Sequence, residues 1–227
     1  ALSLTSQTNK VYSITNKYLD GWRRYDKVTG LWNPKRKQQI EKLRPTCDNL
    51  DQAMNYFHGI KETVEAQATI KDIEFLQIDM TSVAVGVAKQ AELWKNDYGD
   101  VLLTTSRVLL TKLQEKMTTL EGQISAETSD LEQLKFVLNI IAEVLLMVQD
   151  VELEMMDITE RYRTLERYKI PVPPEEMAQA KGIEQRWHEL YCNSRTRDLR
   201  LVDTKQQFRQ VTYDQDSNFR EELKQLL

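Results

Sequence analysis

The sequence contains few of the residues from which catalytic and ligand-binding sites are usually built. Its 227 residues include two histidines and seven glycines, and the glycines are isolated from one another. No segment matches the phosphate-binding loops Gly-x4-Gly-Lys-Ser/Thr or Gly-x-Gly-x-x-Gly. The Glu-x-x-His pairs of helical di-metal sites are also missing. We therefore predict a non-catalytic chain without a cofactor, and we assign no catalytic, cofactor-binding or metal-binding residue.

The strongest metal-site pattern in the sequence is a trio on one expected helix face. Glu184, His188 and Cys192 follow one another at i, i+4 and i+8. A metal site needs three or four ligands with supporting partners, so we interpret His188 as a residue beside the core and Cys192 as a packing or surface thiol. The other cysteine, Cys47, is far away in the sequence, and no signal peptide precedes it. These features favour free thiols in a reducing, intracellular setting.

Long hydrophobic runs are missing as well. The most apolar stretch is 136–148, which is too short to span a bilayer and contains Asn139 and Glu143. It is typical of a helix buried on several sides within a bundle.

Low glycine and proline contents, seven and five residues, accompany many strong helix formers and predict an all-α protein. Apolar residues at spacings of three and four predict long helices over 82–123, from 129 to before Pro171, and from Pro174 to Phe219. Joined by short turns, these helices should run up, down and up and pack at about 20°. The segment 68–81 fits a helix or an irregular connector, although short extended pieces also fit. We predict elongated antiparallel helical bundles that resemble spectrin repeats.

Three prolines interrupt the helical pattern near residues 170–174. Pro171, Pro173 and Pro174 each fix φ and lack an N–H, so a continuous helix cannot pass through them. We interpret these prolines as a structural hinge between helices. The residues expected to anchor the core on either side are Trp94, Tyr98, Trp187, Leu190 and Phe208. The hinge divides the chain into an N-terminal helical segment (1–45), a long-helix bundle (46–169) and a C-terminal helix (170–227).

The charge is unevenly distributed along the chain. Residues 1–45 carry ten Lys/Arg and three Asp/Glu, a net charge of +7, and residues 121–160 carry one Lys and ten Asp/Glu, a net charge of −9. The acidic run is interpreted as the solvated face of a helix, and the alternative is a strip that docks a basic partner or the N-terminal region. The basic residues of the last helix carry a net charge of +3 over 195–209, which predicts salt bridges along the helix rather than nucleic-acid binding.

Several segments resemble the tail of axonemal dynein heavy chains, N-terminal to the linker and motor ring. The first block consists of Tyr162, Leu165 and Tyr168, then Ile170-Pro-Val-Pro-Pro-Glu-Glu-Met177, Trp187-His-Glu-Leu190, Lys205-Gln-Gln-Phe208 and Phe219. The second consists of Asp72-Ile-Glu-Phe-Leu-Gln-Ile-Asp79, Trp94-Lys-Asn-Asp-Tyr-Gly99 and Leu131-Glu-Gln-Leu-Lys-Phe-Val-Leu138, and the third of Trp22-Arg-Arg-Tyr25 with Leu31-Trp32. Their order and spacing extend the resemblance over most of the chain. Because the chain opens with Ala1 and closes within a helical pattern, we expect a piece of a longer polypeptide.

The resemblance implies a structural, force-transmitting segment of a microtubule-based motor of cilia or flagella, located in the cytoskeleton of the axoneme. The implied partners are other dynein heavy chains, intermediate or light chains, and possibly the doublet microtubule, with no nucleic acid and no membrane. The alternative function is a spectrin- or plakin-like helical scaffold unrelated to a motor. A linker and six ATPase modules downstream would distinguish the first function from the second.

Overall fold

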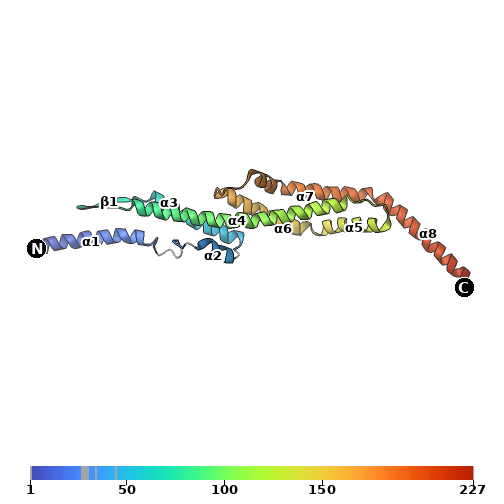
Figure 1. The fold of residues 1–227 in the computed structure, drawn as a ribbon, viewed down its shortest axis with the longest axis horizontal. Helices are drawn as coiled ribbons and strands as arrows, with labels where there is room; N and C mark the ends of the chain where they lie inside the picture. Colours follow the sequence, from blue (N-terminus) through green and yellow to red (C-terminus); the bar gives the residue numbers. More distant parts are fainter. Residues whose placement is uncertain (1, 27–30, 34, 44, 227) are drawn as a thin grey trace. The chain divides into compact units, whose positions relative to one another are not determined.

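Helices account for most of the chain in the computed structural model, which describes residues 2–26, 31–33, 35–43 and 45–226 (Figure 1). In chain order the elements are α1 (Leu2–Arg23), α2 (Arg36–Leu43), α3 (Cys47–Ala66), β1 (Ile70–Ile73), β2 (Leu76–Asp79), α4 (Thr81–Ile124), α5 (Leu131–Leu146), α6 (Val148–Arg167), α7 (Pro174–Arg200) and α8 (Val202–Leu226). The predicted all-α helical bundle class is confirmed, with one small hairpin added. None of these helices is both long and apolar enough to cross a bilayer.

The chain folds into two compact units, and each unit combines two separate stretches of sequence. Unit 1 contains residues 1–105 and 163–171, and unit 2 contains residues 106–162 and 172–227. Helices α4 and α6 therefore each contribute one part to unit 1 and the other part to unit 2.

The core of unit 1 is built around stacked aromatic rings. The ring of Phe57 on α3 stacks on Trp94 of α4 at a centroid distance of 5.2 Å and on Tyr98 at 5.9 Å. The indole Nε1 of Trp94 donates a hydrogen bond to the carbonyl of Leu31 at 2.8 Å, so the ring is buried with its polar atom satisfied. Thr46 caps α3 by accepting a hydrogen bond from the Asn49 N–H. Other buried residues of this core are Trp22, Leu50, Met54, Leu102 and Leu165.

Unit 2 is a bundle in which α4 and α7 run in the same direction. Three side chains of α7 show this direction, because their partners on α4 and just after it have rising residue numbers. The pairs are Glu176 with Arg107, Arg186 with Glu121, and Arg197 with the carbonyl of Ala126. Helices α5 and α6 lie between α4 and α7 in sequence and return the chain, so the predicted up, down and up course is confirmed. The core residues include Leu113, Met117, Val137, Val144, Ile158, Ile183, Trp187 and Leu190.

The start of α5 is capped by polar side chains. The Asp130 side chain accepts a hydrogen bond from the N–H of Gln133 at 2.7 Å, and the Gln133 side chain accepts one from the N–H of Ser129 at 2.9 Å. This reciprocal arrangement satisfies backbone donors that the first helical turn leaves unpaired.

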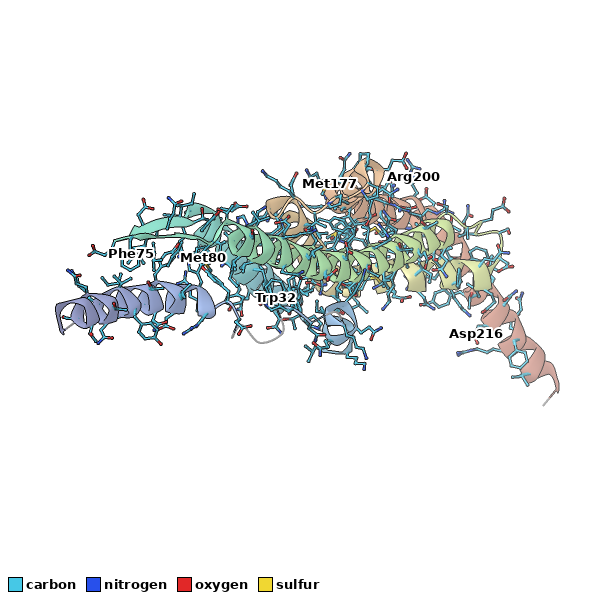
Figure 2. The ribbon with its side chains drawn as sticks, turned by 60° about the vertical axis from the view of Figure 1, so that its left-hand side comes forward. Trp32, Phe75, Met80, Met177, Arg200 and Asp216 are labelled. Carbon is cyan, nitrogen blue, oxygen red and sulfur yellow. The ribbon has the colours of Figure 1, made fainter. Side chains whose placement is uncertain are left out.

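The segment 68–81 is extended, so the favoured interpretation as a helix or irregular connector is wrong and the alternative of short extended pieces is correct. It forms an antiparallel hairpin in which Ile70 pairs with Asp79 and Ile73 with Leu76. Glu74 occupies the turn with φ 56°, a conformation that favours glycine. The turn lacks the Asn-Gly or Asp-Gly pair that usually marks a hairpin, so the sequence indicates extended pieces without indicating that they pair. Phe75 lies exposed at the free end of the hairpin (Figure 2).

Two helices predicted as continuous are bent in the structure. The pattern from 129 to Pro171 is interrupted at Met147, and the pattern after Pro174 is interrupted at Leu201. Both residues have ψ close to 0°, yet the N–H of Met147 still bonds to the Glu143 carbonyl and that of Leu201 to the Arg197 carbonyl. Neither bend lies at a proline or glycine, so the sequence contains no local signal for it.

Candidate functional site

The chain stops being helical between Arg167 and Pro174, where the sequence predicts a hinge. Lys169 has φ 54°, its N–H bonds to the Glu166 carbonyl, and the N–H of Ile170 bonds to the Leu165 carbonyl. These two bonds and the left-handed residue form a Schellman cap, with Leu165 and Ile170 as its apolar pair. Helix α6 therefore ends by its own capping motif, and Pro171 follows directly after it.

Ile170 anchors this end of the segment in unit 1. Its side chain lies against Gly99 of α4 so closely that a Cβ atom added at Gly99 would be 2.6 Å from the Ile170 Cγ1 atom. Both residues are buried. Gly99 therefore allows close packing against α4. We call this contact the Ile170 anchor.

Polar contacts with α3 hold the same end of the segment in unit 1. The Arg167 guanidinium lies 3.1 Å from the Asp51 carboxylate, and the Tyr168 hydroxyl donates a hydrogen bond to the Asp51 carbonyl at 3.3 Å. The ring of Tyr168 also meets the edge of His58. Burial is the main cause that raises the pKa of Tyr168, and its bond to Asp51 adds to this effect.

Glu176 anchors the start of α7 in unit 2. One carboxylate oxygen accepts a hydrogen bond from the Tyr162 hydroxyl at 2.8 Å. The other accepts two from Arg107, at 3.0 Å from Nε and 2.8 Å from Nη2. The carboxylate also lies in the first turn of α7, where a negative charge is favoured by the helix dipole. We call this group the Glu176 clamp; the neighbouring Met177 marks its place in Figure 2.

The Glu176 carboxylate and Tyr162 are largely shielded from solvent. The Glu176 side chain is 12% exposed, and Tyr162 is buried. Burial raises the pKa of Tyr162, and the hydrogen bond to Glu176 raises it further, because ionising the phenol would place two negative charges side by side. Arg107 is half exposed, so the ion pair lies at the edge of the protein interior.

The predicted core anchors occupy different environments. Trp94, Trp187 and Leu190 are buried, and Tyr98 is half-buried in the aromatic stack. Phe208 lies on α8 and is half-buried, whereas Val211 and Phe219 further along α8 are exposed. The anchoring role of these residues and the hinge role of the three prolines stay predictions. The sequence did not identify Glu176, Arg107 and Tyr162 as a group, because charged partners far apart along the chain leave no periodic signal.

Glu184, His188 and Cys192, which share a helix face in the sequence pattern, do not assemble into a ligand set. His188 and Cys192 lie 3.6 Å apart through Nε2 and Sγ. Among the described residues, no group of three or more His, Cys, Asp or Glu side chains is placed to hold a metal ion. The basic residues of the last helices are partly engaged within the chain: Arg197 binds the Ala126 carbonyl, and Lys205 pairs with Asp198 at 2.7 Å.

Comparison with protein families decides which family this is. Residues 98–215, just over half of the chain, match the sequence model of the dynein axonemal heavy chain 2/5/8 coiled-coil. The chain belongs to this axonemal dynein heavy chain family. The match begins at Tyr98, beside Gly99, and includes the Glu176 clamp, the three prolines and Trp187.

Individual dynein heavy chains match over a larger part of the sequence. Dynein axonemal heavy chain 10 of Homo sapiens is 28% identical over 99% of this chain, and the dynein-1-alpha heavy chain of the flagellar inner arm I1 complex of Chlamydomonas reinhardtii is 25% identical over 96%. Dynein axonemal heavy chain 2 of Mus musculus is 19% identical over 77%. The chain spans only 4–5% of the length of these relatives. The matching region is a coiled-coil part of a motor heavy chain, which favours the motor over an unrelated spectrin- or plakin-like scaffold.

Proposed function

We propose that this chain is a non-catalytic, force-transmitting segment of a dynein heavy-chain tail, in a microtubule-based motor of cilia or flagella. The observation that carries this proposal is the double attachment of residues 168–176. The Ile170 anchor and Asp51 hold the first part within unit 1, and the Glu176 clamp holds the last part within unit 2. Each end of the segment is therefore held by contacts within its own unit.

Helix α4 supports the same proposal because it is continuous over 44 residues, or about 66 Å. It carries Gly99 of the Ile170 anchor and Arg107 of the Glu176 clamp, two helical turns further on. A load that reaches the end of α6 or the start of α7 therefore passes to α4. Each large apolar side chain buried along α4 resists separation by roughly 1.5–3 kcal/mol.

The proposed place of this segment is the axoneme, and the relatives that support it are named as axonemal and flagellar inner-arm heavy chains. Its proposed partners are other dynein heavy chains, intermediate or light chains, and the doublet microtubule. ATP hydrolysis would belong to other parts of the heavy chain.

The proposal is tested in a full-length heavy chain that contains this segment. Residues 168–176 are replaced by a Gly/Ser linker of equal length, and microtubule gliding is measured together with ATP turnover. We expect slower gliding with unchanged basal turnover, because the motor still works but its stroke is absorbed by the slack linker. A matched control replaces the exposed turn Glu74-Phe75 with Asn-Gly and should leave both rates unchanged. Normal gliding with the Gly/Ser linker would contradict force transmission.

The hinge is tested in the isolated chain. Replacing Pro171, Pro173 and Pro174 together with alanine removes the three residues that exclude a helix. We expect small-angle scattering to report a changed maximum dimension, because the flanking helices can then fuse or flex. An unchanged dimension would mean that the Schellman cap and the two anchors hold this segment without the prolines.

A further inference from the structure

The outward side of α5 and α6 carries large apolar side chains where a bundle helix normally carries polar ones. Leu146 is 85% exposed, Leu153 is 65% exposed and Met156 is 68% exposed. The residues that face the core of unit 2 from the same helices include Val144 and Val151, which are fully buried. Leu146 ends α5 and Leu153 lies on α6, and each comes two residues after a buried valine of its own helix, so each side chain points away from this core. We call the side with these three residues the outer face.

Acidic side chains without partners surround the outer face. Glu143, Asp150, Glu152 and Glu154 are exposed, and none of their carboxylates has an ion-pair or hydrogen-bond partner among the described residues. The only basic residue between positions 121 and 160 is Lys135, which is paired with Glu132 at 2.7 Å. The outer face is thus a row of apolar side chains within a negative field.

We propose that the outer face docks a basic amphipathic helix of a partner protein. Apolar residues spaced three, four and seven apart on such a helix would cover Leu146, Leu153 and Met156, and flanking Lys or Arg side chains would pair with the free carboxylates. This inference rests on the fold of unit 2 alone, and it stands whether or not the chain transmits force.

A second copy of this chain and the chain's own helix α2 are two other possible occupants of the outer face, and both fit it less well. A second copy that used the same face would bring unpaired carboxylates against one another, which is unfavourable. The chain's own basic helix α2 is already engaged in unit 1, where Ile40 is fully buried and Lys37 pairs with Asp100 at 3.2 Å. A basic helix from another protein satisfies both the apolar row and the carboxylates.

The test measures binding of a synthetic helical peptide to the full 227-residue chain by fluorescence anisotropy. The peptide has about five turns, with leucines at spacings of three, four and seven on one side and Lys or Arg on both flanks. A scrambled peptide of the same composition is the control ligand. We expect the amphipathic peptide to bind at least about tenfold more tightly than the scrambled one.

Three groups of variants locate the binding site. Leu146→Gln, Leu153→Gln and Met156→Gln together should weaken binding by about tenfold or more. Val108→Gln with Leu199→Gln changes exposed apolar residues elsewhere in unit 2 and should have no effect. Neutralising Glu143, Asp150, Glu152 and Glu154 to Gln or Asn should weaken binding at low salt and reduce its salt dependence. Far-UV circular dichroism should match wild type for every variant, because all of the substituted side chains are exposed.

Three results would overturn the proposal. The scrambled peptide could bind as tightly as the amphipathic one, which would reduce the effect to net charge. The triple glutamine variant could bind like wild type, which would place the peptide elsewhere. Sedimentation could show a wild-type dimer that the triple variant abolishes, which would assign the outer face to a second copy.

Discussion

The Ile170 anchor and the Glu176 clamp hold neighbouring parts of one segment by different physical means. In unit 1, an isoleucine fills a notch that only a glycine leaves open. In unit 2, a carboxylate collects hydrogen bonds from a tyrosine and an arginine. The first depends on volume and is insensitive to salt, whereas the second depends on charge. The two attachments should therefore fail under different conditions.

The stability of unit 1 can be measured separately from that of unit 2 because the tryptophans are unevenly divided between the units. Trp22, Trp32 and Trp94 belong to unit 1, and Trp187 is in unit 2. In a Trp187→Phe background, tryptophan fluorescence reports unit 1 alone, while circular dichroism reports both units.

The largest effect is expected for Ile170→Ala. Removing a buried isoleucine from a close contact should destabilise unit 1 by about 2–5 kcal/mol in urea unfolding followed by fluorescence. Ile70→Ala, at an exposed isoleucine of the hairpin, is the matched control and should change stability by less than about 0.5 kcal/mol. Equal losses at the two positions would argue against a specific anchor.

Gly99→Ala tests the same anchor from the other side. The added Cβ atom would overlap Ile170, so we expect a loss of about 1–3 kcal/mol. Gly122→Ala lies on the same helix with nothing near the added atom and should instead stabilise by about 0.5–1 kcal/mol. A stabilising Gly99→Ala would show that Ile170 moves aside at little cost.

Glu176→Gln tests the clamp. Loss of the carboxylate charge weakens the bonds from Arg107 and Tyr162, and we expect unit 2 to lose about 1–3 kcal/mol, with a smaller difference from wild type at high salt. Glu175→Gln changes the exposed neighbour in the same helical turn and should have little effect. Comparable losses at the two positions would assign the effect to the helix dipole rather than to the clamp.

Tyr162→Phe should reveal the clamp at alkaline pH. The folded protein holds the Tyr162 proton more tightly than the unfolded chain does. The protonated hydroxyl therefore contributes to the free energy of unfolding below about pH 10, and this contribution is lost as the pH rises further. Phenylalanine cannot ionise, and the stability of this variant should fall less steeply above that pH in denaturant titrations. Tyr98 and Tyr168 also have raised pKa values, so part of the decline should persist. A slope identical to wild type would contradict the buried hydrogen bond.

The smallest effect is expected for Lys169→Gly. Lysine adopts a left-handed backbone at the cap of α6, and glycine does so without strain. We expect a gain of about 1 kcal/mol in thermal unfolding. Lys181→Gly, in the interior of α7, should lose a similar amount. A destabilising Lys169→Gly would indicate that the lysine side chain itself contributes to the cap.

The sequence predicts those parts of the fold that rest on local chemistry. Apolar residues spaced three and four apart predict the long helices, because a buried helix face repeats with that period. The hairpin turn and the bends at Met147 and Leu201 have no such local signal, so they were not predicted. The predicted segments 1–45, 46–169 and 170–227 follow the chain in order, whereas each compact unit combines two stretches that only tertiary packing brings together.

The candidate site also has a part that the sequence predicts and a part that it does not. Prolines are visible in any sequence, and they correctly mark where helical structure stops. The partners that hold the segment lie about 70 positions away, as with Ile170 and Gly99 or Glu176 and Arg107. Nothing periodic links such pairs, and a resemblance to a family does not name them.

The parallel course of α4 and α7 has a mechanical consequence for unit 2. Tension applied between the start of one helix and the end of the other slides them lengthwise, which loads the Glu176, Arg186 and Arg197 contacts simultaneously in shear. Two antiparallel neighbours pulled at adjacent ends would instead unzip one contact after another. The helix order within this bundle therefore favours stiffness over stepwise extension.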